Sequence, residues 1–507
     1  MPLIYKIMAA LFIVVFSILL FHVSLNGFYS GWFWLILAIG ITFGLLTLPR
    51  SDSSAFLHIL ASILFFLFIG ILPGSAMFGH NADIYKNSIT VKEVSSKDIV
   101  FDSQRVITRE MAGIIASKVL SDGNSSDQIS SQLQLDLSHA SVQMVNNEPL
   151  WVIPLDYSGF SKWTSRDSIP GYVTVSSIDP DQEAILHTGY NIDLSANGYF
   201  HDNISNFTYY STGLKKVTNH FEINDKGEPF YIGLVSKPLV WTELLTTYEV
   251  MVINAQTKEV DTLPVSEVHA KYPWIDRIVH SGFVKEKIHA YGIYQSGWLN
   301  TVWGENGLNK PTEYHGQELW FVRMNGRNVF FTGMSSLNKK NQSLVKGLAV
   351  DTITGEGISF NLSGIMDEAG AMTILNSALG ASSVAWSPIL PQPVMVNGNF
   401  YWGAAIVSNA GIFEKIGVVK GNKASETFFG HSYEQAVKMV NRGVNGLHGS
   451  DSGVVIDSVL GNSTQYPDMN RTGQITMSVE EFVALQNHLN GLIKIVNTLE
   501  SRLYIKK

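Results

Sequence analysis

The chain of 507 residues contains no cysteine. This absence excludes disulfide bonds, thiolate metal sites and cysteine nucleophiles, and it leaves the redox compartment open. The net charge of -8 at pH 7 is mild, and no cluster of basic residues stands out. Because nucleic acids are bound chiefly through clustered Lys and Arg, no nucleic-acid partner is expected.

Motifs for catalysis and cofactor binding are also missing. The 14 histidines show no HExxH spacing, which zinc hydrolases use to place two ligands and a base on one helical face. The nearest pair, His280 and His289, lies among apolar residues that favour ordinary packing. The chain also lacks the GxSxG, P-loop and GxGxxG patterns. We therefore predict no catalytic residue, no cofactor and no metal site.

Charged residues are scarce in the first 78 positions, where only Lys6, Arg50 and Asp52 occur. Three apolar segments, each long enough for the roughly 20 residues of a membrane span, cover residues 3–23, 28–48 and 56–78. A cleaved signal peptide is the alternative for the first segment, but two further segments and no small-residue cleavage site argue against it. The pattern predicts a three-helix transmembrane anchor over residues 1–78, with a lipid membrane as a partner.

The orientation of this predicted anchor depends on few charges. With a cytoplasmic N-terminus, Lys6 and Arg50 both lie inside, as the positive-inside bias prefers. Lys86, Lys92 and Lys97 follow the third segment and count against this arrangement. On balance we predict a multi-pass membrane protein whose soluble domain lies on the extracytoplasmic side.

A pattern of two hairpins recurs four times in the rest of the chain. Each first hairpin has a strand, a tight turn containing Asn and an aromatic-rich strand, at residues 141–155, 220–235, 319–334 and 393–407. Asn and Gly accept the positive φ that such turns need. A second hairpin with alternating apolar residues follows each one, starting at residues 171, 248, 346 and 414. Four antiparallel units are therefore expected.

Helices are expected beside these hairpins, because Thr108, Asp367 and Ser432 stand where an N-cap is favoured. The predicted fold class is α+β, with a three-helix transmembrane anchor, about four antiparallel β-hairpin repeats with covering helices, and a C-terminal coiled-coil helix. After the anchor we predict a linker (79–105), repeat 1 (106–190) and repeat 2 (191–278). An insertion plus repeat 3 (279–365) and repeat 4 (366–443) follow. A second linker (444–476) leads to the final helix (477–507).

Several segments carry a resemblance to known proteins. The second-hairpin turns VINAQTKEV and VDTITGEG resemble PepSY-type repeats. The segments at 151–155, 168–175, 272–278 and 330–336 (WVIPL, SIPGYVTV, YPWIDRI and FFTGMSS) resemble a family of multi-span membrane-anchored proteins of bacteria and large bacteriophages. The resemblance covers about residues 100–440. It brings no site residue with it, because no activity is assigned to that family. The resemblance to PepSY-type repeats implies extracytoplasmic modules that bind or restrain partners, and some of these partners are peptidases.

The C-terminus departs from this resemblance. Ser478 and Glu481 form a capping box, and apolar residues then alternate spacings of three and four at Phe482, Leu485, Leu489, Leu492, Val496, Leu499 and Leu503. Such a seam predicts a coiled coil that joins copies of the chain into a homo-oligomer. The alternative is a helix that packs its apolar stripe on the protein's own sheets.

One loop outside the repeats, rich in Gly and Asn, carries Trp298 and Trp303. Because loops carry recognition more often than cores do, we predict a partner contact there. Most aromatic residues of the hairpins are expected in the core.

These observations predict a non-enzymatic, membrane-anchored scaffold or interaction protein that self-associates and presents β-rich surfaces to a protein partner. The alternatives are an envelope enzyme, or a PepSY-like regulator of a peptidase, and a ligand sensor. The enzyme alternative requires a deep pocket with perturbed carboxylates or histidines near residues 280–316.

Overall fold

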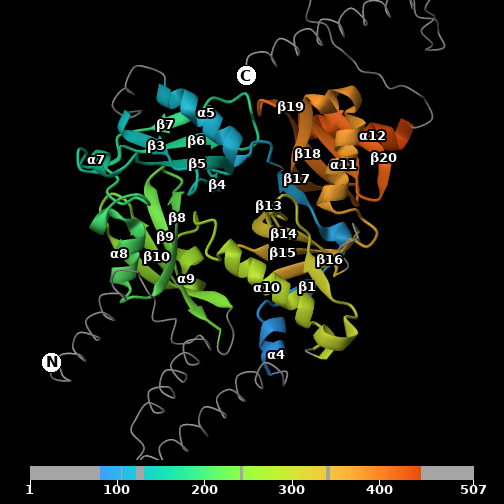
Figure 1. Ribbon diagram of the computed structural model, residues 1–507, viewed down its shortest axis with the longest axis horizontal. Helices are drawn as coiled ribbons and strands as arrows, with labels where there is room; N and C mark the ends of the chain where they lie inside the picture. Colours follow the sequence, from blue (N-terminus) through green and yellow to red (C-terminus); the bar gives the residue numbers. More distant parts are fainter. Residues whose placement is uncertain are drawn as a thin grey trace, which may run out of the picture. The chain divides into compact units, whose positions relative to one another are not determined.

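The computed structural model describes residues 80–103, 105–121, 131–239, 244–297, 299–337 and 343–446. The chain divides into two units, Met1–Gly446 and Leu447–Lys507, and all described residues belong to the first. Their strands form four sheets, whose arrows are coloured mainly teal, green, yellow and orange in Figure 1.

The first sheet is antiparallel, in the order β3-β5-β6-β7, and β4 also pairs with β5. Its strands are β3 (Leu133–Leu135), β4 (Ser141–Val145), β5 (Glu148–Tyr157), β6 (Tyr172–Ser176) and β7 (Ile185–His187). Asn146 and Asn147 form the two-residue β4–β5 turn with φ of 51° and 65°, the positive values that this turn requires. Helix α5 (Arg109–Ser121) packs on β6 and β7, while α7 (Phe160–Trp163) lies between β5 and β6 in the chain.

The second sheet is also antiparallel, in the order β11-β10-β9-β8. Its strands are β8 (Lys216–Ile223), β9 (Pro229–Pro238), β10 (Leu245–Asn254) and β11 (Val260–Pro264). The 3-10 turn η3 (Phe200–Asp202) and helix α8 (Ile204–Ser211) precede β8, and α9 (Val265–Lys271) packs on β10 and β11. After α9 the chain runs to the third sheet, where the backbone N–H of Ile278 donates to the carbonyl of Thr352 (2.9 Å).

The third sheet has the order β1-β16-β15-β14-β13-β2, and β12 pairs with β14. Its strands are β1 (Val91–Glu93), β2 (Phe101–Ser103), β12 (Asn309–Pro311), β13 (Trp320–Met324), β14 (Arg327–Ser336), β15 (Leu344–Asp351) and β16 (Gly357–Asn361). Only the β1–β16 pair within this sheet is parallel. Helix α10 (Ser281–Tyr294) packs on β12 and β14 and contacts α4 (His80–Lys86). The remaining turns are η2 (Ser96–Asp98) and η4 (Asn300–Gly304).

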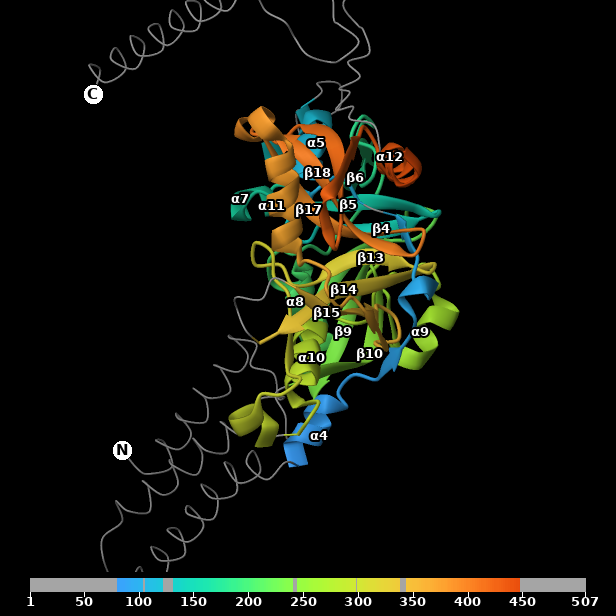
Figure 2. The ribbon, with the colours of Figure 1, turned by 90° about the vertical axis from the view of Figure 1, so that its right-hand side faces the viewer.

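The fourth sheet has the order β17-β18-β19-β20, and its strand β18 is buried on both faces. Its elements are β17 (Trp386–Val396), β18 (Asn399–Ser408), β19 (Phe413–Lys420), β20 (Lys423–Gly430), α11 (Glu368–Ala378), η5 (Gly380–Val384) and α12 (Tyr433–Gly446). Because side chains alternate along a strand, Trp402 joins the buried cluster that contains Leu375 of α11, whereas Tyr401 joins the one that contains Ala436 of α12. The two helices therefore cover opposite faces (Figure 2).

These two clusters connect the sheets to one another. The first contains buried residues of the first, second and fourth sheets, such as Trp151, Phe221 and Tyr401. The second joins the third sheet to the fourth through contacts such as that between Phe331 and Trp402, whose ring centroids lie 6.2 Å apart. Burial of one such aromatic side chain stabilises the fold by about 2–3 kcal/mol, so the four sheets are expected to stabilise each other.

The edge strand of the fourth sheet has an unusual composition. Strand β17 lies at the end of the strand order and carries Pro388, Pro391 and Pro393. A bulge falls between Ile389 and Gln392. Proline has no N–H to donate to a further strand, and natural sheets use proline and bulges to protect their edges.

The predicted fold class is wrong on two points. The described part of the chain is mostly β-sheet, with 41% strand and 27% helix. No helix within the described ranges is long and apolar enough to cross a membrane. The longest, α10 and α12, have 14 residues each, whereas a span needs roughly 20. The predictions of a transmembrane anchor and of a multi-pass protein with an extracytoplasmic domain are corrected by this finding.

Some predictions fall on parts of the chain that the structure does not describe. The apolar segments 3–23, 28–48 and 56–78 lie outside the described residues, as does the seam from Phe482 to Leu503. The predicted coiled coil is at odds with a β-rich chain, and the oligomerisation role of the seam residues stays a prediction. The predicted domain boundaries are likewise untested.

Candidate functional site: a polar junction between three sheets

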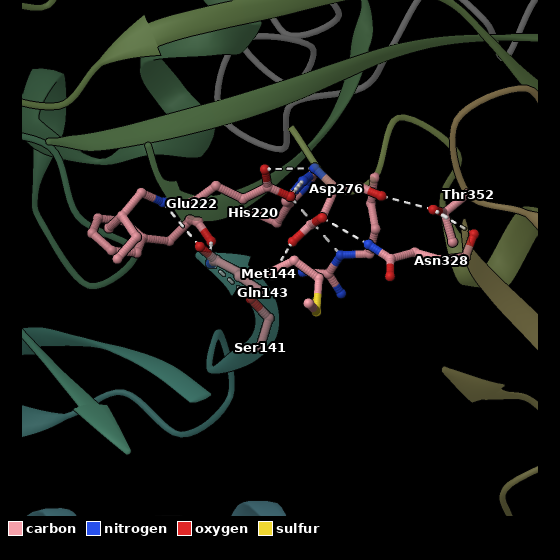
Figure 3. Close-up of polar contacts among 11 residues, drawn as sticks. Ser141, Gln143, Met144, His220, Glu222, Asp276, Asn328 and Thr352 are labelled. Carbon is pink, nitrogen blue, oxygen red and sulfur yellow. Dashed lines mark hydrogen bonds and ion pairs between the residues drawn. The ribbon is translucent and has the colours of Figure 1, made fainter. Parts of the chain in front are cut away.

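Buried polar side chains gather where the first three sheets meet, as Figure 3 shows. Strand β4 supplies Gln143, β8 supplies Glu222, and the loop after α9 supplies Asp276. The third sheet contributes Asn328 from β14 and Thr352, which follows β15. We call these five residues the junction.

Asp276 lies at the centre of the junction and is 9% exposed. Its carboxylate accepts hydrogen bonds from the backbone N–H of Met144 and from the side-chain amide of Asn328, the latter at 2.7 Å. Its carbonyl accepts from the hydroxyl of Thr352 (2.7 Å), and its N–H donates to Glu222 (3.2 Å). This one residue therefore links the first three sheets.

Gln143 makes a second link between the first and second sheets. Its amide nitrogen donates to the carbonyl of Phe221 (2.7 Å), and its amide oxygen accepts from the N–H of Ile223 (3.0 Å). The side chain is 2% exposed. A buried amide that pairs with two backbone groups of a neighbouring strand imitates strand pairing, so β4 and β8 are fixed in register without belonging to one sheet.

Glu222 is 1% exposed, and its Oε1 lies 3.0 Å from Nε2 of His220. Burial, and then the charge of Arg277, lower the pKa of His220. The ring is therefore neutral, and its contact with Glu222 is a hydrogen bond rather than an ion pair. The Nε of Arg277 lies 4.0 Å from Oε1 of Glu222, and its guanidinium lies 5.5 Å from the ring centroid of Phe321.

Both junction carboxyls hold their protons more tightly than usual. Burial raises the pKa of Glu222, and the charge of Arg277 opposes this. Burial also raises the pKa of Asp276, and the neighbouring charge of Glu222 raises it further. Because two nearby carboxylates in a low-dielectric site do not both ionise readily, the pair is expected to share a proton near neutral pH.

A cavity of about 620 Å³ opens beside the junction, and we call it the junction cleft. Its lining combines three aspartates, two arginines, amides and a tryptophan: Asp225, Asp276, Asp351, Arg323, Arg327, Asn146, Asn147, Asn328 and Trp274 are among them. Several of these side chains are held by neighbours. Arg327 lies 3.5 Å from Asp351, Asn146 donates to the carbonyl of Asp225 (3.1 Å), and Trp274 packs on Phe230 with ring centroids 4.9 Å apart.

The residues predicted from the sequence lie elsewhere. Trp303 is 78% exposed in η4, apart from the residues that line the junction cleft, and Trp298 lies outside the described residues. The nearest histidine pair is not a cluster. The Nδ1 of His280 accepts from the N–H of Gly282 at the start of α10 (3.2 Å), whereas His289 contacts Glu318 (2.6 Å). Neither this cavity nor a smaller one beside β17 and β18 is lined by residues 280–316.

Sequence reasoning missed the junction, although Asp276 lies in the segment YPWIDRI. The signal that was present is a pair of polar residues, His220 and Glu222, on one face of a strand whose other face carries Phe221 and Ile223. Such alternation normally indicates a solvent-facing side, and here that side is covered by another sheet.

Within the described ranges, no group of three or more His, Asp or Glu side chains is placed to hold a metal ion. Comparisons with protein-family models, with curated proteins and with solved structures find no match for this chain. A function is therefore argued from the site itself.

Proposed function

We propose that the chain is an interaction protein that binds a polar segment of a partner in the junction cleft. The observation that carries the proposal is that the polar wall of the cleft is built and held by the protein's own hydrogen bonds. Both carboxylate oxygens of Asp276 accept from protein groups. A wall fixed before the partner arrives lowers the entropy lost on binding.

The same contacts disfavour chemistry at this site. A catalytic carboxyl needs an oxygen that can reach a substrate, but Glu222 is 1% exposed and the oxygens of Asp276 are occupied. The function predicted from the sequence, an interaction protein with β-rich surfaces, is kept in this proposal, whereas the membrane anchoring is not. The PepSY-type resemblance is compatible with it, since such modules are expected to bind or restrain partners.

The composition of the cleft indicates the kind of partner. Its volume falls within the range of about 300–1,000 Å³ typical of ligand pockets, but those pockets are mostly apolar. Here two arginines and three aspartates share the lining with Trp274 and His269. Mixed charge of this kind suits a polar peptide segment that carries both signs, because a strongly charged ligand of either sign would meet repulsion.

The test begins with a displayed library of random peptides selected on the full chain. We expect selected peptides to bind Arg323→Ala and Trp274→Ala at least tenfold more weakly than the unchanged chain, since Arg and Trp are frequent hot spots. Arg109→Ala, which removes an exposed arginine of α5, is the charge-matched control and should change nothing. Peptides whose affinity ignores both cleft substitutions would overturn the proposal.

One observation favours a second candidate, an enzyme that uses Asp276 as a general acid. This carboxyl lines the cavity, and its pKa is raised toward neutrality, a common property of catalytic acids. If the chain is such an enzyme, it should turn over chromogenic esters, peptides or glycosides. Asp276→Asn should abolish this turnover while peptide binding persists. The binding proposal predicts no turnover by either chain. The ligand-sensor alternative gains no support from the site.

A further inference from the structure

A group of four aromatic side chains lies at the surface of the molecule, away from the junction residues. Phe160 and Trp163 come from α7, and Tyr199 and Phe200 from the start of η3. We call these four the aromatic cluster. Ring centroids lie 5.0 Å apart for Phe160 and Tyr199, 5.4 Å for Trp163 and Tyr199, and 5.8 Å for Trp163 and Phe200. Phe160 is 52% exposed, Tyr199 36% and Phe200 68%.

The polar atom of the tryptophan is already satisfied within the protein. The indole N–H of Trp163 donates to Asp202 (3.0 Å), whose other oxygen accepts from the ammonium of Lys258 (3.0 Å). The surface that Trp163 offers is therefore its ring. Recognition at the cluster must come mainly from apolar and ring contacts, which are the usual centre of a binding hot spot.

The backbone of the cluster is strained at Phe200 and is held there by side-chain hydrogen bonds. Phe200 has a φ of 54°, a value that bulky residues adopt rarely and that costs about 1–3 kcal/mol. Its carbonyl accepts from the side-chain amide of Asn206 (3.0 Å), and the amide of Asn203 donates to the carbonyl of Ala196 (2.7 Å). Strain that surrounding contacts maintain, and that keeps a phenyl ring in water, is typical of a binding site.

The size of the cluster limits what it can bind. Fully buried aromatic side chains account for roughly 150–250 Å² each, so the exposed parts of these rings amount to only a few hundred Å². A stable complex between folded domains buries at least about 1,000 Å². The partner that this area fits is a short segment of chain rather than a second globular surface.

The shape and the rim narrow the choice further. Neighbouring rings are tilted by 35° to 83°, so they do not form the flat platform on which a sugar ring stacks. The exposed residues next to them in the sequence are mostly uncharged: Ser158, Ser161, Thr164, Ser165 and Asn197, with Asp167 and His201 as the exceptions. Surfaces lined by aromatic side chains bind the proline side chains of polyproline II segments, which lose little entropy on binding because they are already extended.

We propose that Phe160, Trp163, Tyr199 and Phe200 form a docking site for a short proline-rich peptide segment of a partner protein. The site is separate from the junction cleft, since the two share no lining residue. It stands whether or not the cleft binds a partner.

The experiment titrates fluorescein-labelled decaproline with the full chain and follows fluorescence anisotropy. We expect saturable binding, and an affinity about tenfold weaker in Phe160→Ala and in Phe200→Asn. Asparagine is chosen because it accepts positive φ, so the ring is removed while the backbone is preserved. Val384→Ala, at a side chain that is 83% exposed, is the control and should bind as the unchanged chain does.

Three outcomes would overturn the proposal. The first is that decaproline binds no more tightly than a labelled Gly-Ser peptide of equal length. The second is that Phe160→Ala and Phe200→Asn leave the affinity for decaproline unchanged. The third is that chitohexaose or cellohexaose binds in a way that depends on Phe200 while decaproline does not bind, which would identify a carbohydrate site. Circular dichroism of each variant confirms that the fold is intact before its affinity is compared.

Discussion

The junction and the aromatic cluster differ in which groups they leave for a partner. At the junction, polar groups are buried and almost every hydrogen bond of Asp276 and Gln143 is made within the protein. At the cluster, aromatic rings are exposed and the one polar atom of Trp163 is satisfied internally. The difference teaches that burial sets the role of a side chain here. Changes at the junction should act on stability, and changes at the cluster on binding.

The largest expected effect comes from Asp276→Ala. The substitution leaves the N–H of Met144 and the amide of Asn328 without acceptors in a buried site, so we expect a loss of about 3–5 kcal/mol in the free energy of unfolding. Urea denaturation followed by circular dichroism measures it. Asp181→Ala, at an exposed turn, is the matched control and should change stability by less than about 0.5 kcal/mol.

The second effect depends on pH. Burial raises the pKa of Glu222 from 4.5 to about 7 in the folded chain. The stability it contributes is therefore complete below pH 4.5 and is lost as the pH rises through about 7. Gln cannot ionise. The free energy of unfolding of Glu222→Gln, relative to that of the unchanged chain, should therefore rise by about 2–3 kcal/mol from pH 5 to pH 8. Removing the charge of Glu222 also lowers the pKa of Asp276, and this change acts in the same direction.

A matched comparison at the cluster makes this test sharper. The stability difference between Phe160→Ala and the unchanged chain should stay constant over the same pH range, since no ionisable group is removed. Parallel curves for Glu222→Gln and Phe160→Ala would contradict the assignment of the raised pKa to burial at the junction.

An intermediate effect is expected from Gln143→Leu. The leucine side chain nearly matches the volume but leaves the N–H of Ile223 and the carbonyl of Phe221 unpaired, at a cost of about 2 kcal/mol. Hydrogen exchange read by mass spectrometry should show faster exchange at the peptide that contains Ile223. Unchanged protection there would mean that Gln143 does not fix the two sheets in register.

The smallest effect is a gain in stability. Phe200→Gly should stabilise the chain by about 1 kcal/mol, because glycine adopts a φ of 54° without strain. The thermal midpoint should rise slightly while decaproline binding is lost. A fall in the midpoint would indicate that the packing of Phe200 on Trp163 outweighs the backbone strain, and the cluster would then resemble the junction in supporting the fold.

Local features of this fold are those that sequence reasoning predicts best. Asn146, Asn325 and Asn397 occupy hairpin turns at positive φ, which follows from the chemistry of the residue itself. Asp367 accepts from the N–H of Gly370 at the start of α11 (2.8 Å), as an N-cap should. Such features depend on neighbours within a few positions, so the sequence contains them directly.

The junction could not be predicted because its contacts are long-range. Gln143 and Ile223 are 80 positions apart, and Met144 and Asp276 are 132 apart. Periodicity shows which side of a strand is polar, but not whether another sheet covers it. The same limit applies to the aromatic cluster, which brings together Trp163 and Tyr199 from separate segments of the chain.

The prolines of β17 have a consequence for behaviour at high concentration. A chain composed of several antiparallel sheets is prone to join copies of itself through hydrogen bonds between open edges, which can continue without limit into aggregates. Pro388, Pro391 and Pro393 remove donors along this edge, and the bulge beside Gln392 disrupts its regular spacing. These prolines are buried in the folded chain, so this edge would offer few N–H donors to a further strand even if partial unfolding exposed it.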